Sequence, residues 1–552
     1  MTEHLRGARL LIAGLLAAGI PPRYAEGQAS SPPQAWTLQT EQPIEWLRFL
    51  PSRLLIVSSD DGLRALDPAD GSVRWRRDDL GNVSQVSFEA AQQSAPLPGA
   101  AQRAPPRAGP VMRLMEELPG GRLIAILADL ADRHSWFDVL EVQTGATVWS
   151  STSLPIGDGH GFLAFPDSAT LLVHGVVIEP GRRRRVWLRV EAASGRTIWT
   201  TDSLLLEPPA EFDASTMLAS RGSINGNQPL VALPDSTVAL YASLDGMVCF
   251  EIPTGRVRWR TPLSTGQLAP IGQGYAPILV SGDTAYLPAG TSVHAIDLTG
   301  GHHLWTTGGL PTMTSQMAAT PLGLLLRGQP VPPAQDATAQ RPFIALVDPV
   351  AGKIRWKKTF KLRSGTTPFA LGKEEVFMAS DEGLVRLSLA EGAERPLTTG
   401  KFPGRPVLSL EAHDDAMLVG ASQSLTLVGL DGVQRYQTEY PAPTLGIGGR
   451  LLRVALGAVA AAGGYYYSGG YLAGTAFAKY QYSTSRFSSA NAYFVLKDHN
   501  GEGPALAKID KATGDITAVV TLGGDKTPEY VIDGFSGLLL LKSDRVLRAY
   551  RW

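Results

Sequence analysis

The chain has 552 residues, of which 50 are basic and 51 acidic, and its net charge at pH 7 is −1. This balance provides no basic surface for nucleic acid, so we expect no nucleic-acid partner. The 59 glycines and 40 prolines, with few long amphipathic helical patterns, indicate a turn-rich all-β protein. Cys249 is the only cysteine, so the chain has no internal disulfide, and it falls in a strand-like pattern that favours a buried structural thiol.

The N-terminal residues resemble an export signal. Arg6 and Arg9 precede the apolar stretch Leu10–Ile20, and Gly27 and Ala29 provide small residues before a cleavage site ahead of Ser30. The apolar stretch is too short to span a bilayer comfortably, and no cysteine follows closely enough for a lipoprotein anchor. We therefore predict a cleaved signal over residues 1–29 and a periplasmic or secreted protein. An uncleaved anchor is the alternative, and it would make the protein a membrane-associated sensor ectodomain.

A short phrase then returns nine times along the chain. In its full form an acid ends a strand, a glycine follows four residues later, and a tryptophan follows four residues after the glycine. The six full copies contain Asp67, Gly71 and Trp75; Glu141, Gly145 and Trp149; Glu191, Gly195 and Trp199; Glu251, Gly255 and Trp259; Asp297, Gly301 and Trp305; and Asp348, Gly352 and Trp356. The weaker copies are Leu387–Pro396, Leu427–Tyr436 and Ile509–Ala518.

Each residue type of the phrase has a structural role in a tight turn between antiparallel strands. Glycine adopts a positive φ at low cost, and the acid can accept hydrogen bonds from free backbone N–H groups of the turn. The tryptophan lies on the outermost strand, where its ring can cover the seam to the next repeat while the indole N–H finds a partner. The phrase therefore predicts architecture rather than chemistry.

Most repeats are about 40–60 residues long, the length of one four-stranded propeller blade. The C-terminal segment Glu529–Trp552 contains three strand-like runs and lacks a fourth, which the lone segment Trp36–Gln42 can supply. We predict a single all-β propeller of four-stranded antiparallel blades. The expected number is eight to ten, with a direct motif count of ten, and the ring closes by pairing of the N-terminal strand with the C-terminal strands.

The phrase resembles the pyrroloquinoline-quinone-type repeat over roughly Trp36–Pro441 and Ala505–Trp552. This repeat occurs in the propeller subunit of the bacterial outer-membrane protein assembly machine and, more distantly, in periplasmic quinoprotein dehydrogenases. The resemblance implies a propeller whose blades are held together by tryptophan docking. The repeat itself occurs in both enzymes and scaffolds. The dehydrogenases typically use a vicinal Cys–Cys disulfide and a calcium site, and many carry a haem-binding C-x-x-C-H motif. This chain has one cysteine and no such motif.

The sequence departs from the repeat most strongly in a Gly/Tyr-rich insertion. We divide the chain into the signal at 1–29, blades at 30–441, the insertion at 442–492, and the final blades with ring closure at 493–552. The insertion is either a loop over one face of the ring, a docking site for a partner, or a peripheral membrane contact. Its candidate interaction residues are Tyr465, Tyr466, Tyr467, Tyr471, Tyr480 and Tyr482.

The other charged or potentially metal-binding groups are explained by ordinary structural roles. The basic run Arg182–Arg185 favours a solvated hairpin tip over an anionic-lipid contact, and Asp498–Glu502 favours a plain turn over a calcium loop. None of the nine histidines forms a metal-binding spacing, and His302 and His303, adjacent on an outer strand, cannot easily chelate one ion together. We expect no catalytic, cofactor-binding or metal-binding residues.

These expectations combine into one function. The sequence favours an exported, non-catalytic and monomeric propeller that binds a protein partner in the bacterial cell envelope and needs no cofactor. The main alternative is a quinone- or metal-dependent periplasmic oxidoreductase or small-ligand binder.

Overall fold

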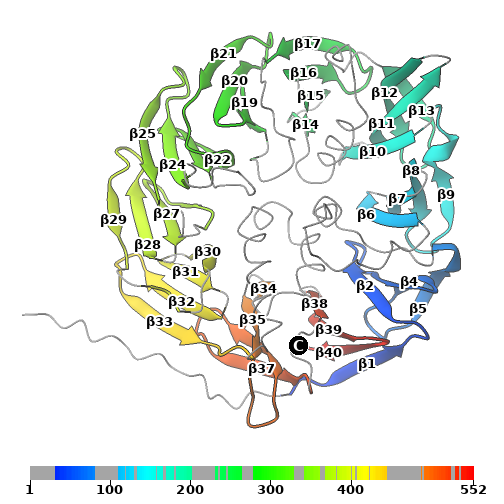
Figure 1. The fold of residues 1–552 in the computed structure, drawn as a ribbon, viewed down its shortest axis with the longest axis vertical. Coiled ribbons are helices and arrows are strands. Elements are labelled where there is room, and N and C mark those ends of the chain that lie inside the picture. The colour runs from blue at the N-terminus through cyan, green and yellow to red at the C-terminus, as the bar shows by residue number, and fades with distance from the viewer. Residues whose placement is uncertain are drawn as a thin grey trace, which may run out of the picture.

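A computed structural model gives the fold of the chain (Figure 1). It describes residues 31–552 apart from 81–109, 119, 130–133, 157, 166–169, 180–181, 202–229, 234–236, 244–245, 264–275, 277, 329–340, 361–366, 381, 399–400, 404–406, 414, 422, 444–485, 488–489, 524–528 and 534–535. The predicted signal over 1–29 and most of the insertion at 442–492 lie outside these residues. The domain division therefore stays a prediction.

The described residues form forty β-strands and two 3-10 helices, with no α-helix among them. The 3-10 helices are η1 (Asp78–Leu80) and η2 (Ser151–Ser153). The strands of the first half are β1 (Gln34–Gln39), β2 (Ile44–Phe49), β3 (Leu55–Ser59), β4 (Gly62–Leu66), β5 (Val73–Arg77), β6 (Pro110–Leu118), β7 (Arg122–Asp129), β8 (His134–Glu141), β9 (Thr147–Ser150), β10 (Asp158–Phe165), β11 (Thr170–Glu179), β12 (Arg182–Glu191), β13 (Thr197–Thr201), β14 (Leu230–Ala232), β15 (Val238–Ser243), β16 (Gly246–Glu251), β17 (Val257–Pro262), β18 (Leu279–Ser281), β19 (Thr284–Ala289), β20 (Ser292–Asp297) and β21 (His303–Thr307). Those of the second half are β22 (Thr314–Thr320), β23 (Gly323–Gly328), β24 (Phe343–Val347), β25 (Ile354–Thr359), β26 (Ala370–Leu371), β27 (Glu375–Ser380), β28 (Gly383–Ser388), β29 (Glu394–Pro396), β30 (Val407–His413), β31 (Ala416–Ala421), β32 (Ser424–Gly429), β33 (Gln434–Glu439), β34 (Arg486–Phe487), β35 (Asn491–Leu496), β36 (Ala505–Asp510), β37 (Ile516–Thr521), β38 (Glu529–Asp533), β39 (Leu538–Ser543) and β40 (Val546–Arg551).

The forty strands form ten four-stranded antiparallel sheets. Nine sheets consist of four strands that follow one another in the chain, from β2–β5 to β34–β37. The tenth has the order β1-β40-β39-β38, so the N-terminal strand pairs with the C-terminal one, with Thr37 opposite Arg548. Figure 1 shows the sheets around a common centre, with β1 beside β40. The predicted all-β class and the predicted pairing of the two chain ends are confirmed.

The burial pattern explains why the strands of a sheet differ in sequence. The two middle strands are apolar runs because both of their faces are covered, as in β3 and β4 or in β23 and β24, where every residue is buried. The outermost strands alternate instead, as in β25, where half-buried and exposed residues take turns. Fully burying one large apolar side chain stabilises a fold by about 1.5–3 kcal/mol.

The core lies in the seams between neighbouring sheets. One cluster joins Leu66 of β4 to Trp36 of β1 and Ala549 of β40. Another joins Trp75 of β5 to Leu140 of β8, in the next sheet. Cys249 lies buried in β16, as its strand-like pattern predicts.

Alternating strand direction separates the connections onto two faces. The third-to-fourth-strand turns, which contain the repeat phrase, share one face with the first-to-second-strand turns. We call this the repeat face. The second-to-third-strand hairpins and the links between sheets attach to the opposite side, the hairpin face. The strand ends that flank residues 81–109, 202–229 and 444–485 all belong to the hairpin face.

Candidate functional site

The repeat phrase builds one contact, which recurs at successive seams. The tryptophan of one sheet lies flat on the repeat glycine of the next, so close that a Cβ on that glycine would fall 2.5–2.9 Å from its ring. Each indole Nε1 donates to a backbone carbonyl of the same turn at 2.7–3.0 Å. The pairs are Trp36 with Gly71, Trp75 with Gly145, Trp149 with Gly195, Trp199 with Gly255, Trp259 with Gly301, Trp305 with Gly352 and Trp356 with Gly392.

The acids of the phrase divide into two groups. The aspartates hold the turn itself: Asp348 Oδ1 accepts the N–H groups of Val350 and Ala351 at 2.9 and 2.8 Å, and Asp67 and Asp297 make similar contacts. The glutamates bind side chains instead. Glu141 pairs with Arg122, Glu191 pairs with Arg196 and accepts the Ser194 hydroxyl, and Glu251 pairs with Arg256 and accepts the Thr254 hydroxyl.

From the sequence we expected every one of these acids to accept hydrogen bonds from the backbone N–H groups of its turn. For the three glutamates this prediction was wrong. The extra methylene carries the glutamate carboxylate past the turn and towards neighbouring side chains. These partners still favour the ionised form. Hydrogen bonds from Arg256 and Thr254 lower the pKa of Glu251 to about 2, and those from Ala351, Arg355 and Val350 lower that of Asp348 to about 2.

Two seams depart from the tryptophan contact. In the β30–β33 sheet, Tyr436 replaces tryptophan and packs on Gly514, while its hydroxyl donates to Lys511 O. The buried Lys511 ammonium also pairs with Glu411 at 2.6 Å across this seam. In the β26–β29 sheet, Pro396 occupies the tryptophan position, and the atom facing Gly432 is the backbone carbonyl oxygen of Leu397. This seam therefore lacks an aromatic contact of the repeat type.

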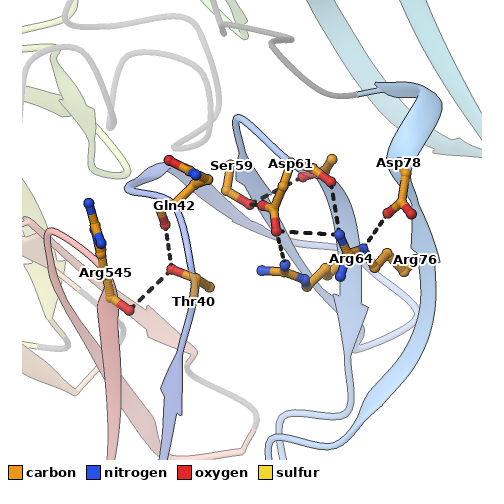
Figure 2. Close-up of polar contacts among 9 residues, drawn as sticks. Thr40, Gln42, Ser59, Asp61, Arg64, Arg76, Asp78 and Arg545 are labelled. Atoms are coloured by element: carbon orange, nitrogen blue, oxygen red, sulfur yellow. Dashed lines mark hydrogen bonds and ion pairs between the residues drawn. The ribbon is translucent and has the colours of Figure 1, made fainter.

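A polar cluster lies where the two chain ends meet, on the hairpin face (Figure 2). Thr40 Oγ1 lies 2.6 Å from Gln42 O and 3.1 Å from Arg545 O, which ties the end of β1 to the turn before β40. Beside it, Asp61 accepts the Ser59 hydroxyl at 2.5 Å and pairs with Arg64 and Arg76. Burial alone would raise the pKa of Asp61, but the Ser59 hydrogen bond and the two guanidinium groups lower it. These contacts hold the junction together and leave Asp61 ionised.

The described residues offer few groups with catalytic character. They contain no cluster of three or more His, Cys, Asp or Glu side chains able to hold a metal. Burial raises the pKa of Cys249 to about 11, which keeps its thiol protonated and unreactive. A pocket of about 320 Å³ opens beside the short strand β29, and its lining includes Glu394, which pairs with Lys358 at 2.5 Å. None of the described residues forms a helix with the length and apolarity needed to cross a bilayer.

The structure tests some candidate residues and leaves others outside its range. Asp498 accepts the N–H groups of Gly501 and Gly503 at 3.0 and 2.7 Å, so the predicted turn is present in this segment. Arg182 begins β12 opposite Glu179, which confirms a hairpin. The six candidate interaction residues, Tyr465, Tyr466, Tyr467, Tyr471, Tyr480 and Tyr482, lie outside the described residues.

Sequence reasoning missed several contacts. The docking of Trp36 on Gly71 was not foreseen, because Trp36 belongs to no copy of the phrase, although its strand was assigned correctly. Lys511 with Glu411 and His294 with His303 are neighbours only through sheet packing or strand pairing. Their spacing along the chain carries no signal for either pair.

The repeated tryptophan–glycine contact is accompanied by a match to a known protein family. The family model described as outer membrane protein assembly factor BamB matches residues 134–316 and 289–473. The chain belongs to this family. The matched residues run from β8 into the segment after β33 and include five full copies of the phrase.

Solved structures give distant matches. The crystal structure of BamB from Moraxella catarrhalis is 13% identical and covers 71% of this chain and 97% of its own, with a TM-score of 0.35. A computationally designed protein, Ika8, is 12% identical and covers 70% and 96%, with a TM-score of 0.31. A eukaryotic initiation factor is 10% identical and covers 91% and 90%, with a TM-score of 0.35. No curated protein matches the chain.

Proposed function

We propose that this protein is an exported, non-catalytic β-propeller that binds another protein in the bacterial cell envelope. The observation that carries the proposal is membership of the BamB family, whose description names a factor in outer-membrane protein assembly. The export-like N-terminus agrees with this location. The repeat residues make turn and seam contacts, and these structural contacts explain their presence in the repeat.

The proposal includes a single closed ring of ten blades. Support comes from the ten four-stranded sheets, the seven tryptophan seams and the pairing of β1 with β40. Closure removes exposed sheet edges and gives a rigid platform. Such a platform holds binding loops in fixed positions, which suits a scaffold.

The hairpin face is the side that we propose for partner binding. The third-to-fourth-strand turns of the repeat face are short and alike. In eight of the nine copies of the phrase the glycine N–H donates to the carbonyl four residues earlier, and in the copy at Gly432 the turn is one residue shorter. The hairpin face receives the connections that differ most in length, including the Gly/Tyr-rich segment between β33 and β34. Variable connections on a rigid scaffold are where binding residues concentrate.

Co-purification from the envelope fraction tests the proposal. We expect the full chain to retain a stoichiometric protein partner. Deletion of residues 446–482, which removes the six candidate tyrosines and leaves β34 in place, should abolish its recovery without lowering the melting temperature. The matched control shortens another connection of the same face, within residues 90–105, and should keep the partner. Recovery of the same partners with and without residues 446–482 would contradict the role of the insertion.

Binding of a redox cofactor would contradict the non-catalytic part of the proposal. Titration of the purified chain with pyrroloquinoline quinone, followed by absorbance, should show no saturable binding. A stoichiometric chromophore or bound calcium ion would instead support an oxidoreductase.

A further inference from the structure

One sheet carries two histidines at positions that the repeat fills with other residue types. His294 lies on β20, and His303 and Thr306 lie on the outermost strand β21. The positions equivalent to His303 in other sheets hold Val73, Thr147, Thr197, Val257 and Ile354. Those equivalent to His294 hold Arg64, Asp138, Leu188, Val248 and Ala345. Building a sheet of this repeat therefore requires no imidazole at either place.

Strand pairing brings these side chains to one side of the sheet. His294 is directly opposite Thr306, and a register shift follows between Ala295 and Ile296, so that Ile296 is opposite His303. In a regular strand, residues three apart point to opposite sides, but a bulge restores them to the same side. Leu304 is the extra residue here. The bulge belongs to the repeat, because the same shift occurs beside Trp75 and Trp259.

The three polar atoms form a compact triangle. His294 Nδ1 and His303 Nε2 are 3.3 Å apart, and Thr306 Oγ1 lies 3.0 Å from the first and 2.9 Å from the second. The backbone of two paired strands holds this arrangement. His303 and Thr306 are exposed, so the triangle is open to solvent, while His294 is half-buried.

This spacing matches zinc coordination. Two Zn–N bonds of about 2.0–2.1 Å at a tetrahedral angle hold their nitrogens about 3.3 Å apart, whereas cis ligands in a square plane lie about 2.9 Å apart. The observed 3.3 Å is the tetrahedral value. The Thr306 hydroxyl lies closer, at 3.0 and 2.9 Å from the two nitrogens, which is hydrogen-bond distance and places it beside an ion that both nitrogens would bind.

We propose that His294, His303 and Thr306 form a zinc-binding site on the outermost edge of the β18–β21 sheet. His294 Nδ1 and His303 Nε2 donate their lone pairs to the ion. Thr306 Oγ1 either completes the face or hydrogen-bonds to a zinc-bound water. At least one coordination position stays open to solvent, available to water or to a side chain of a bound protein.

The surroundings of His294 are compatible with this role. Burial, followed by the neighbouring His303, lowers the pKa of His294 below its usual value. The ion would tie the edge strand β21 to β20, next to the seam that Trp305 closes.

Calorimetric titration of the tag-free full chain with Zn²⁺ tests the proposal. We expect one zinc site, whose affinity falls on the order of tenfold or more in His303→Ala. Loss of a residue that only orients a metal ligand already lowers metal affinity by about this factor, and loss of the ligand itself should lower it at least as much. His302→Ala is the matched control: this exposed neighbour takes no part in the triangle, and its loss should leave the affinity unchanged. Thr306→Val should weaken binding less than His303→Ala.

A folding defect is separated from ligand loss by two further measurements. Circular dichroism and the zinc-free melting temperature of His303→Ala should match those of His302→Ala. X-ray absorption of the zinc-loaded protein should show two imidazole nitrogens in the coordination shell. Absence of zinc binding to the unaltered chain, or equal affinity in His303→Ala and His302→Ala, would overturn the proposal.

Discussion

Gly301 shows how one residue can set the distance between two sheets. Its φ is +73°, and a Cβ there would lie 2.5 Å from the Trp259 ring. Gly309 has a nearly identical φ of +71° but has nothing within 4 Å of a Cβ. The two positions therefore share the backbone cost of an alanine and differ only in contact with the tryptophan.

Gly301→Ala should therefore destabilise the protein more than Gly309→Ala. Both lose about 1–2 kcal/mol from a left-handed backbone without glycine, and overpacking against Trp259 adds about 1–3 kcal/mol at Gly301. Thermal unfolding of the two variants measures the difference. Equal melting temperatures would mean that the tryptophan does not rest on this glycine in solution.

Asp348 links the repeat turn to pH. Its pKa of about 2 lies below the ordinary value of 3.8, so its stabilising effect is present above pH 3.8 and is lost as pH falls through about 2. Asp348→Asn should therefore remove part of the fall in melting temperature between pH 5 and pH 2. The two proteins should show parallel curves between pH 6 and pH 8. An unchanged acid limb in the variant would contradict the contacts assigned to this carboxylate.

The strands and turns show which parts of the structure the sequence predicts. Strands such as Val238–Ser243 and Ala416–Ala421 are short apolar runs, a pattern that the sequence alone identifies as buried strand. The histidine triangle and the Lys511–Glu411 pair arise from register and packing between strands. These two contacts depend on a one-residue bulge and on the packing of one sheet against the next. Neither feature produces a recognisable residue spacing in the sequence. The six candidate tyrosines of the insertion at 442–492 remain a prediction, because they lie outside the described residues.

The β26–β29 sheet has the weakest outer strand among the nine sheets of consecutive strands with a repeat turn. Its strand β29 covers only Glu394–Pro396, and Pro396 supplies neither a ring over Gly432 nor an indole N–H. Amide hydrogen exchange should therefore be faster in β28 and β29 than in β24 and β25, where Trp356 seals the seam. Equal protection of the two strand pairs would show that the proline seam is as tight as a tryptophan seam.

At the scale of the whole molecule, the proposed ring depends on the pairing of the two chain ends. The composite sheet and the cluster around Trp36 join residues near position 36 to residues near position 549. A motif count can suggest ten units, but the proposed ring also needs pairing across more than five hundred residues, as between β1 and β40. A scaffold with fixed binding loops requires this closure.

A disulfide between Thr37→Cys and Arg548→Cys tests this closure most directly. The two residues are opposite each other in β1 and β40, a spacing that suits a disulfide, and neither side chain is fully buried. The native Cys249 can stay, because it is buried and its pKa is raised to about 11. We predict that mild oxidation of the folded double variant links the two cysteines nearly completely, as judged by electrophoretic mobility without reductant. The linked protein should also have a higher melting temperature than the reduced one. Two cysteines that stay reduced in the folded protein would contradict the closed ring.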